Sequence, residues 1–581
     1  MREPTRIGVV RHVLGSLVTV ELVTDLAGTS PIWEGHLQPI GQIGSLVRIP
    51  QGPITLLASV VMIGISELSG APAPGSAPTV GDRWLQVQLL GELDALGQFS
   101  RGVSSFPGLD DEVHFATRSD LARVFPLGDD KHVRLGGLSA FREIPVALNA
   151  SLLVLRHSAV VGSTGSGKTS AVSTLLQNFV HGGFTASNIV VIDPHGEYGR
   201  ALGSIGAVAS VMGSRENRLK VPYWAVPASD LLRILTGSEG ATLLTRFSEL
   251  VSEERRAFAA TSRWLSIPEP LIAADTPVPF DLHNVWYRLA YENSATYKDG
   301  KDLGDVMLLD PGDAETLKPP QFAVPTAKNS APYQGTSYGR YSVFPDRMRL
   351  KLSDERLQFF LSRDDLVAIE DPLPQYITQW LGNSAPISVL DLSGATSEAT
   401  DLSVGIILDT LFQLATHSSK GIGKGSPVLV VLEEAHRYLG DSKDTQNAKT
   451  SVNRIAREGR KYGLGIMLIS QRPSELPETA LSQVGTVVAL RLTNGADQSC
   501  VKKALPDSLQ GLADALPSLR TGEAIVSGEA TTIPARSLID APNPRPQAED
   551  PPLSPWRSGT KALALADAIA EWRGAPEKRA Q

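Results

Sequence analysis

The sequence predicts an α/β protein that combines a parallel β-sheet core with an amino-terminal β-barrel and a helical insertion. From about residue 145, short apolar runs alternate with helical patterns, which is typical of a parallel sheet covered on both faces. Before that point, short strand-like segments separated by turns fill the chain, and between about 225 and 385 the strand pattern lapses. A length of 581 residues is enough for about three or four domains.

Residues 1–135 are predicted to form the barrel. Residues 18–22 alternate apolar and polar side chains, as a half-buried strand does. Segments 43–49, 54–61 and 84–90 read as further strands. Several short strands at this spacing favour a small β-barrel.

The sheet core is predicted to span residues 145–225 and 386–540. Its strands are continuous apolar runs, which is the pattern of a strand buried on both faces. These runs lie at residues 188–193, 387–392, 427–432 and 465–469.

An insertion at residues 226–385 is predicted to interrupt this core. Leucines recur at helical spacing within 231–273, so that part is predicted to be helical. Residues 290–342 are polar and rich in Gly, Pro, Tyr and Ser, which favours a long, partly disordered loop. After the core, residues 541–581 are predicted to form a proline-rich arm with a short helix at 561–573.

The segment 162–169 fits the Gly-x-x-x-x-Gly-Lys-[Ser/Thr] pattern of a phosphate-binding loop. It follows an apolar run at 157–161 and precedes a helical pattern at 169–179, which is the context that such a loop requires. We predict that the loop binds ATP, that Lys168 reaches the β- and γ-phosphates, and that the Thr169 hydroxyl holds Mg²⁺. The predicted nucleotide-binding residues of the loop are Gly162, Ser163, Thr164, Gly165, Ser166, Gly167, Lys168 and Thr169.

Two adjacent acids follow the apolar run at 428–432. We predict that Glu433 lies beside Mg²⁺ and that Glu434 is the base that orients the attacking water. The first acid at such a position is usually Asp, and the longer Glu433 side chain can reach the same site through one water. Taken alone, the pair could equally be solvated acids at a strand end, and the phosphate-binding loop favours the catalytic interpretation.

Two further polar residues end predicted strands. Asp193 ends the run at 188–193, where an acid can sit beside the phosphates, and we include it among the nucleotide-binding candidates. Nearby His195 and Glu197 are either members of the same network or turn residues. Gln471 follows the run at 466–470, and a polar side chain there can sense the γ-phosphate.

The segment 454–463 is unusually basic. Arg454, Arg457 and Lys461 share one face of a predicted helix. An arginine that reaches a neighbouring subunit's γ-phosphate stabilises the charge of the transition state. The alternative is a solvated basic helix. Arg156, twelve residues before Lys168, is a second candidate for phosphate or interface contact.

Composition limits the possible cellular location and cofactors of the chain. A single cysteine, Cys500, excludes an internal disulfide framework and a Cys-based zinc site. No apolar run approaches the ~20 residues needed to cross a membrane, and the amino terminus lacks the apolar core of a signal peptide. We therefore expect a cytoplasmic protein with no membrane partner. The net charge of −8 does not itself indicate nucleic-acid binding, although a ring needs positive charge only along its channel.

Six motifs carry a family resemblance. They include the phosphate-binding loop with Arg156 before it, the sequence Asp193-Pro-His-Gly-Glu-Tyr198 and the acid pair Glu433-Glu434. The six segments are 155–169, 192–198, 432–438, 458–463, 470–473 and 519–528. Together they resemble the HerA family of hexameric DNA translocases, over about residues 5–540.

The resemblance implies an amino-terminal barrel, a RecA-like ATPase core of the kind shared by RecA and FtsK, a helical insertion and a carboxy-terminal arm. It also implies a homohexamer with ATP at the subunit interfaces and double-stranded DNA in the central channel. In that family the arginine that acts on the neighbouring subunit lies on the helix before the sensor strand, and Arg457 and Arg460 are both matching positions. The resemblance further implies a partner that docks on the barrel: a nuclease, as NurA is in archaea, or an antiphage-defence effector such as a sirtuin-type NADase or a nuclease.

The leading hypothesis is therefore an ATP-hydrolysing hexameric DNA translocase or helicase that works with such a partner. A second hypothesis is an ATP-dependent hexameric scaffold that assembles and regulates a defence effector without processive DNA translocation. A third is a secretion or conjugation ATPase of the same superfamily, which the barrel and the absence of apolar membrane spans disfavour.

Overall fold

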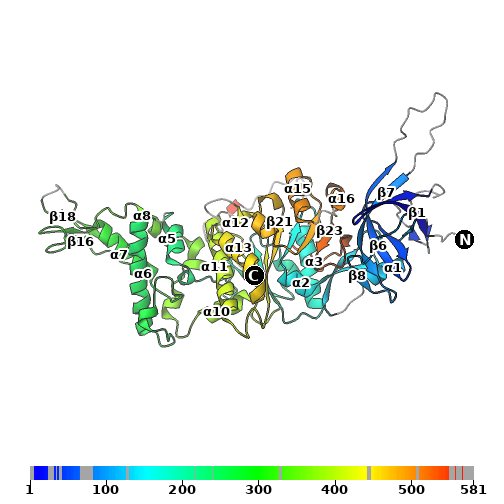
Figure 1. Cartoon of the computed structure of the whole chain (residues 1–581). Helices are drawn as coiled ribbons and strands as arrows, with labels where there is room; N and C mark the ends of the chain where they lie inside the picture. Colours follow the sequence, from blue (N-terminus) through cyan, green and yellow to red (C-terminus); the bar gives the residue numbers. More distant parts are fainter. Residues whose placement is uncertain are drawn as a thin grey trace, which may run out of the picture.

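The chain has three parts in a row: the barrel at one end, the sheet core in the middle and the helical insertion at the other end (Figure 1). The computed structural model describes residues 5–23, 32–33, 36–37, 42–65, 83–125, 130–214, 216–237, 240–325, 330–440, 446–505, 510–547, 557, 565–566 and 569.

The barrel forms because alternate residues of its strands are apolar and point inward. Its strands are β1 (Arg6–Leu14), β2 (Leu17–Leu22), β5 (Leu46–Gln51), β6 (Ile54–Ile65), β7 (Arg83–Leu93), β8 (Phe99–Arg101) and β9 (Glu112–Phe115). They pair antiparallel in the order β2-β1-β9-β5-β6-β7-β8, and a β2–β7 pairing closes the sheet. Val10, Val18, Ile49 and Val87 are fully buried inside it. The predicted barrel is confirmed. A hairpin of β3 (Ile32–Trp33) and β4 (His36–Leu37) and helix α1 (Arg118–Val124) complete this part.

The core is one eleven-stranded sheet in the order β11-β10-β24-β23-β22-β12-β21-β20-β13-β19-β14. Strands β22 to β14 of this order are parallel to their neighbours, and β23, β24, β10 and β11 extend the sheet antiparallel. The parallel strands are β12 (Ser158–Val161), β13 (Asn188–Asp193), β14 (Ala207–Ser210), β19 (Ile387–Asp391), β20 (Val428–Leu432), β21 (Leu464–Ser470) and β22 (Thr486–Leu490). The antiparallel ones are β10 (His132–Leu138), β11 (Pro145–Asn149), β23 (Glu523–Gly528) and β24 (Ala535–Ile539). The predicted parallel sheet is confirmed, and its four apolar runs form β13, β19, β20 and β21.

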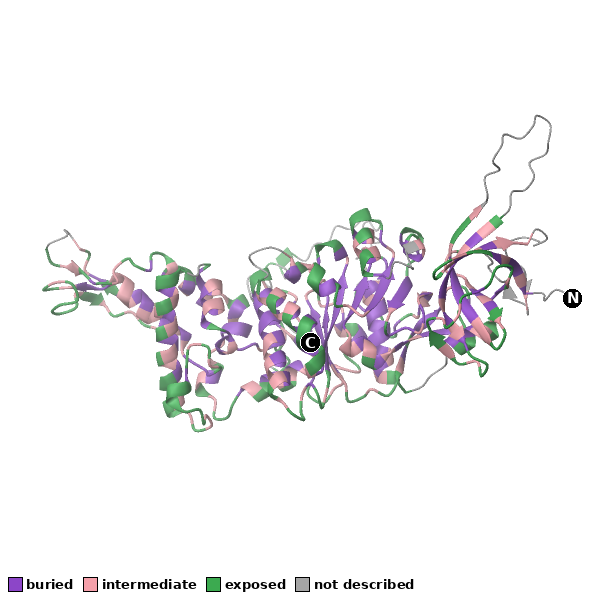
Figure 2. Ribbon diagram, viewed as in Figure 1, coloured by how far each residue is buried: buried purple, intermediate pink, exposed green. Residues whose placement is uncertain are grey.

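Helices cover both faces of this sheet. One face packs against α2 (Ala150–Leu155), α3 (Lys168–His181) and α4 (Gly199–Leu202), and the other against α11 (Ser397–His417) and α13 (Gln446–Glu458). Buried residues are concentrated in this part of the molecule (Figure 2). Short helices α12 (His436–Leu439), α14 (Glu478–Leu481), α15 (Gly495–Ala504) and α16 (Gln510–Ala513) complete the core.

The insertion packs around three buried tryptophans, Trp224, Trp286 and Trp380. Its helices are α5 (Ala228–Thr236), α6 (Ala241–Thr261), α7 (Leu282–Ser294), α8 (Phe344–Leu352), α9 (Gln358–Leu361) and α10 (Leu373–Trp380). Residues 290–342 were predicted to be a long loop, and most of the described part is irregular, but α7 extends to Ser294 and four strands of two or three residues follow. Two small antiparallel sheets form there, because extended backbone pairs even without a strong apolar pattern. They consist of β15 (Thr296–Tyr297) with β18 (Tyr333–Gln334), and β16 (Leu308–Asp310) with β17 (Gln321–Phe322).

The carboxy-terminal arm runs along α3. Asn543 donates its backbone N–H to Gln177 at 2.8 Å, and Gln547 donates its own to the carbonyl of Glu197 at 2.9 Å. The short helix predicted at 561–573 lies almost entirely outside the described residues. No helix among the described residues is long and apolar enough to span a membrane.

Candidate nucleotide-binding site

The phosphate-binding loop connects β12 to α3 in the middle of the sheet. Gly165 and Gly167 have φ of +72° and +99°, a backbone conformation that favours glycine and turns the peptide N–H groups inward. Two neighbouring strand ends hold the loop. Ser163 donates its N–H to the carbonyl of Arg491 at 2.8 Å, and the carbonyl of Ser166 accepts from the N–H of Gly522 at 2.9 Å. The loop is therefore preformed at the amino end of α3.

Two loop hydroxyls contact side chains from other strand ends. Thr164 Oγ1 donates to Gln471 Oε1 at 2.6 Å, which places the predicted sensor against the loop. Thr169 Oγ1 donates to Glu197 Oε2 at 2.9 Å. Lys168 begins α3 and is buried. Side chains from β21 and from the turn after β13 therefore both contact the loop.

Glu433 lies directly after β20 and is only 2% exposed. The hydroxyl of buried Tyr198 donates to its carboxylate. Burial raises the pKa of Glu433 to about 8, although the hydrogen bond from Tyr198 opposes the rise. A buried carboxyl that feels the charges of Lys168 and of Glu197, the partner of the Thr169 hydroxyl, fits a Mg²⁺ site, because a bound cation would favour the ionised form.

Glu434 has a φ of +48°, which is rare for a residue with a side chain. Its Oε2 lies 3.2 Å from Nδ1 of His436. Burial alone would raise the pKa of Glu434, but His436 and the charge of Lys168 lower it overall. The residue is therefore an ionised carboxylate at neutral pH, as a base that orients water must be.

Asp193 is fully buried at the end of β13. Its carboxylate accepts backbone N–H groups from His195, Gly196 and Tyr198 at 3.2, 2.9 and 2.9 Å. The direct contact of Asp193 with nucleotide stays a prediction, since Oδ2 accepts a single backbone N–H and keeps acceptor capacity. Asp193 shapes the turn that carries Glu197 and Tyr198 to the loop.

Arg156 lies at the opposite end of the sheet from the loop. It caps the carboxyl end of α2 before β12 begins, and its Nε lies 3.4 Å from Oε2 of Glu529. β12 separates it from the loop of its own chain, so the predicted phosphate contact is not possible within one chain. The alternative, contact with a neighbouring subunit, stays a prediction.

Arg457 and Arg460 also lie at that opposite end. Arg457 is in the last turn of α13, and Arg460 is in η6 (Gly459–Tyr462), which leads into the amino end of β21. Seven residues of strand, about 20 Å, separate this end of β21 from Gln471. Both arginines are exposed, and no described residue forms a hydrogen bond or ion pair with either guanidinium. Neighbouring Arg454 is engaged instead, with Asp409 at 3.2 Å.

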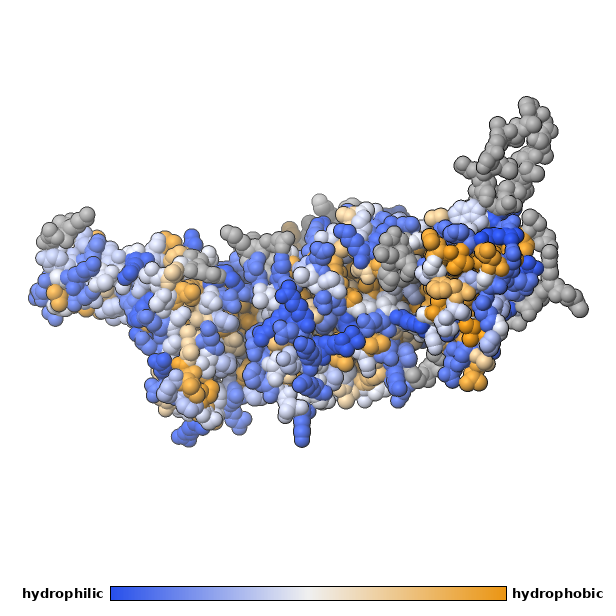
Figure 3. Space-filling view, in the orientation of Figure 1, coloured by the Kyte–Doolittle hydropathy of each residue, from blue (hydrophilic) through white to orange (hydrophobic). Residues whose placement is uncertain are grey.

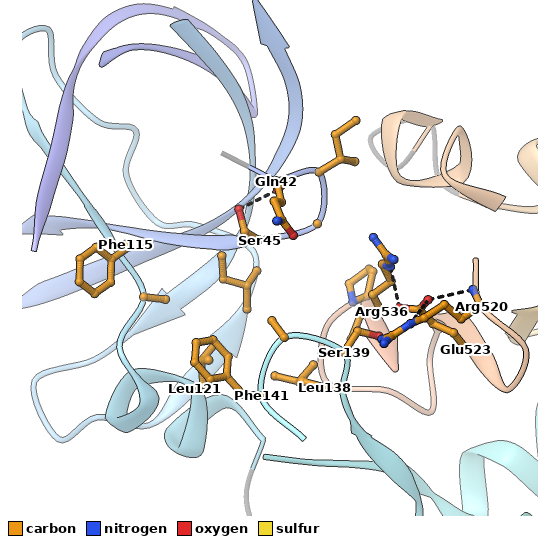
Figure 4. A pocket seen from close by; sticks show the side chains of 17 residues that line it. Gln42, Ser45, Phe115, Leu121, Leu138, Ser139, Phe141, Arg520, Glu523 and Arg536 are labelled. Carbon is orange, nitrogen blue, oxygen red and sulfur yellow. Dashed lines mark hydrogen bonds and ion pairs between the residues drawn. The ribbon is translucent and has the colours of Figure 1, made fainter. Parts of the chain in front are cut away.

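A cavity of about 310 Å³ lies between the core and the barrel (Figure 4). Buried Glu523 stands at its core side and pairs with Arg520 at 3.3 Å and with Arg536 at 3.0 Å. Burial alone would raise the pKa of Glu523, but the hydrogen bonds from Arg536 and Arg520 lower it to about 2. Because Gly522 donates to Ser166, the same strand contacts both the cavity and the phosphate-binding loop.

Comparison with known proteins identifies the family. The family model described as "Helicase HerA, central domain" matches residues 133–411, and "Helicase HerA-like C-terminal" matches residues 407–546. The chain belongs to the HerA family. It is a P-loop ATPase of that family, and the resemblance recognised from the six sequence motifs is confirmed.

Several HerA relatives align over most of their length. The chain is 27% identical to "DNA double-strand break repair helicase HerA" of Sulfolobus acidocaldarius, over 84% of each chain. It is 25% identical to the protein of the same name from Pyrococcus furiosus, over 69% of this chain and 68% of the other. Among solved structures, the plasmid coupling protein TrwB with an ATP analogue matches with 14% identity and a TM-score of 0.44, over 75% of this chain and 94% of that one.

Sequence reasoning missed the roles of two tyrosines at this site. The hydroxyl of Tyr198 contacts Glu433 across 235 residues of sequence, and that of Tyr438 contacts the Glu433 carbonyl. The motifs around both residues were visible in the sequence, but only the pairing of β13 with β20 brings the first contact about. Glu197 was left open between network and turn, and its bond to Thr169 places it in the network.

Proposed function

We propose that this HerA-family ATPase hydrolyses ATP with Mg²⁺ as a ring of six copies, and that the ring moves along double-stranded DNA. The observation that carries the proposal is the division of charged groups between the two ends of the sheet. The loop and the acids are assembled at one end, and the exposed Arg457 and Arg460 lie at the other. In a head-to-tail ring, the arginines of one copy face the site of the next.

The site residues then have distinct roles. The loop N–H groups and Lys168 bind the ATP phosphates, and Thr169 and Glu433 hold Mg²⁺. The bound ion would neutralise charge that develops on the phosphates. Glu434 orients the attacking water, and Gln471, already in contact with the loop, reports on the γ-phosphate. Arg457 or Arg460 from the neighbouring copy stabilises the transition state.

DNA as the partner is supported by the relatives, which carry the name of DNA double-strand break repair helicases. A net charge of −8 is compatible with this role, because only the channel must attract phosphates. We propose Lys449, Arg454 and Lys461 as candidate channel residues, although Arg454 already pairs with Asp409.

We also propose that a nuclease or an antiphage-defence effector docks on the barrel. Apolar side chains gather on the visible surface of the barrel (Figure 3). Exposed Leu14, Met62, Ile63 and Leu96 contribute to the apolar surface of this part. Exposed apolar area of this kind is typical of surfaces that bind another protein.

The test is ATP hydrolysis by the purified chain at low salt, with and without duplex DNA, for the wild type and for Glu434→Gln. The proposal predicts hydrolysis that duplex DNA stimulates and that the substitution abolishes. Hydrolysis without any response to DNA would contradict a translocase. Full cellular function in Glu434→Gln would instead identify an ATP-dependent scaffold.

A further inference from the structure

Two buried tyrosines hold the acid pair from opposite sides, and nothing in the hydrolysis scheme above uses them. Tyr198 and Tyr438 are 0% and 2% exposed. The hydroxyl of Tyr198 donates to the side-chain carboxylate of Glu433, whereas that of Tyr438 donates to the main-chain carbonyl of the same residue. Glu433 is thus fixed at both its side chain and its backbone.

Tyr198 is itself held in place by the neighbouring strand. Its backbone N–H donates to Oδ2 of Asp193 at 2.9 Å, at the end of β13. β13 pairs with β20 in parallel, with Ile192 opposite Leu432, so the turn after one strand lies beside the acids after the other. The ring cannot turn away without breaking this packing, and its hydroxyl leaves one carboxylate oxygen of Glu433 for another ligand.

Tyr438 acts on the peptide next to the strained residue. Glu434 follows the carbonyl that Tyr438 holds, and its φ of +48° is a strained conformation that persists only where the surrounding structure enforces it. On the other side of the strained residue, the N–H of Ala435 donates to the carbonyl of Ile469 in β21 at 2.8 Å. The kink is therefore fixed on both sides, and it directs the Glu434 carboxylate toward His436 at 3.2 Å.

We propose that Tyr198 and Tyr438 are positioning residues for ATP hydrolysis, with separate targets: Tyr198 orients the carboxylate of Glu433, and Tyr438 orients Glu434 through its backbone. The inference rests on the proposed roles of the two acids. It predicts that removal of each hydroxyl changes a different kinetic property, because one hydroxyl acts on the metal-side acid and the other on the base.

The experiment measures kcat, the KM for ATP and the Mg²⁺ concentration for half-maximal rate in Tyr198→Phe and Tyr438→Phe, in the full chain. Tyr198→Phe should lower kcat roughly 10- to 100-fold and raise the Mg²⁺ requirement by a similar factor. Tyr438→Phe should lower kcat about tenfold or more with the wild-type Mg²⁺ requirement. The KM for ATP should stay near the wild-type value in both, because the phosphate-binding loop is untouched.

A matched control separates positioning from lost stability. Tyr223 is buried to the same degree, and its hydroxyl donates to the carbonyl of Phe280 within the insertion, away from the acids. Tyr223→Phe loses one buried hydrogen bond, so its thermal stability should fall as in the other two variants while kcat and the Mg²⁺ requirement stay unchanged.

Wild-type kcat and Mg²⁺ requirement in Tyr198→Phe would overturn the inference, as would an equal loss of kcat in Tyr223→Phe. A wild-type chain that does not hydrolyse ATP, or a fully active Glu434→Gln, would overturn the proposed roles of the acids instead. The two failures are therefore distinguishable.

Discussion

The two ends of the parallel strands differ in how fully their charged side chains are engaged. At the carboxyl ends, Lys168, Glu433 and Asp193 are buried, and the two acids accept hydrogen bonds from hydroxyl and backbone N–H groups of the same chain. At the amino ends, Arg457 and Arg460 are exposed and no described residue pairs with either. At one end the charged groups are engaged within the chain, and at the other the described part of the chain offers the two arginines no partner.

In the proposed ring, one chain would carry both halves of a catalytic site that forms only between copies. The rigid strand ends hold groups that must be placed accurately, because hydrolysis depends on the position of water and Mg²⁺. The exposed helix end would hold groups that act when a second copy approaches. A ring of identical copies would bring the two ends together at every interface.

We expect the largest loss of ATP hydrolysis from substitution of the exposed arginines. One of Arg457→Ala and Arg460→Ala should lower kcat by about 10³-fold or more, because the transition state loses a stabilising charge. The other should change kcat only modestly. The KM for ATP and the thermal stability of both variants should stay near wild-type values, since neither side chain has a partner within the described residues. Wild-type hydrolysis in both single variants and in the double variant would contradict a role of the exposed arginines in catalysis.

Glu434→Gln tests the role of the acid pair at the carboxyl ends of the strands. It should lower kcat by about 10²- to 10⁴-fold, because the amide cannot accept a proton from water. Binding of ATP should persist, since the phosphate-binding loop is unchanged. Equilibrium binding of a fluorescent ATP analogue, measured beside steady-state hydrolysis, separates the two effects. Loss of binding equal to the loss of kcat would mean that Glu434 supports the loop and is not the base.

Glu523→Gln tests whether the ion pairs of Glu523 with Arg520 and Arg536 stabilise the fold next to the phosphate-binding loop. Removing the carboxylate would leave Arg536 and Arg520 without their shared partner and lower the free energy of unfolding by up to about 3 kcal/mol at pH 7. The folded-state pKa of about 2 lies below the ordinary unfolded value, so this stabilisation is complete above about pH 4.3. It is lost as pH falls toward 2. Chemical unfolding at pH 7 and pH 3 should show the variant approaching wild type at the lower pH; an equal gap at both would contradict the assignment.

Asp193→Asn should have the smallest effect of the four. The amide keeps one acceptor oxygen and places an NH₂ group against a backbone N–H donor, which should lower the free energy of unfolding by about 2 kcal/mol. If Asp193 only shapes the turn, kcat should fall through displaced Tyr198 and Glu197, whereas the affinity for nucleotide should change little. A loss of nucleotide affinity with an unchanged free energy of unfolding would instead support the direct contact between Asp193 and nucleotide that the sequence predicts.

The sequence predicted the central strands because a strand buried on both faces must be apolar along its length, as 188–193 and 428–432 are. It also located the loop, the acid pair and Gln471, since each follows directly on such a run. The antiparallel extension was harder to predict. β24 pairs with β10 across some four hundred residues, and no local pattern specifies that partner.

Three residues show what a local pattern could not predict. An acid after a strand can sit beside the phosphates, but the sequence did not show that three local N–H groups contact the Asp193 carboxylate. Tyr198 was quoted only as part of a motif, since its contact with Glu433 depends on strand order. Arg156 stands near the loop in sequence, yet β12 carries the chain from the amino ends of the parallel strands to their carboxyl ends between them.

The most direct test of the account is complementation between two inactive variants. Lys168→Ala removes the phosphate-binding end, and Arg457→Ala with Arg460→Ala removes the exposed end. If the site forms between copies, coexpression of the two variants at equal amounts should restore roughly a quarter of the wild-type interfaces, and with them a measurable rate of ATP hydrolysis, although each variant alone is inactive. Two folded, assembled and co-purifying variants that together hydrolyse no ATP would contradict a site shared between neighbouring copies.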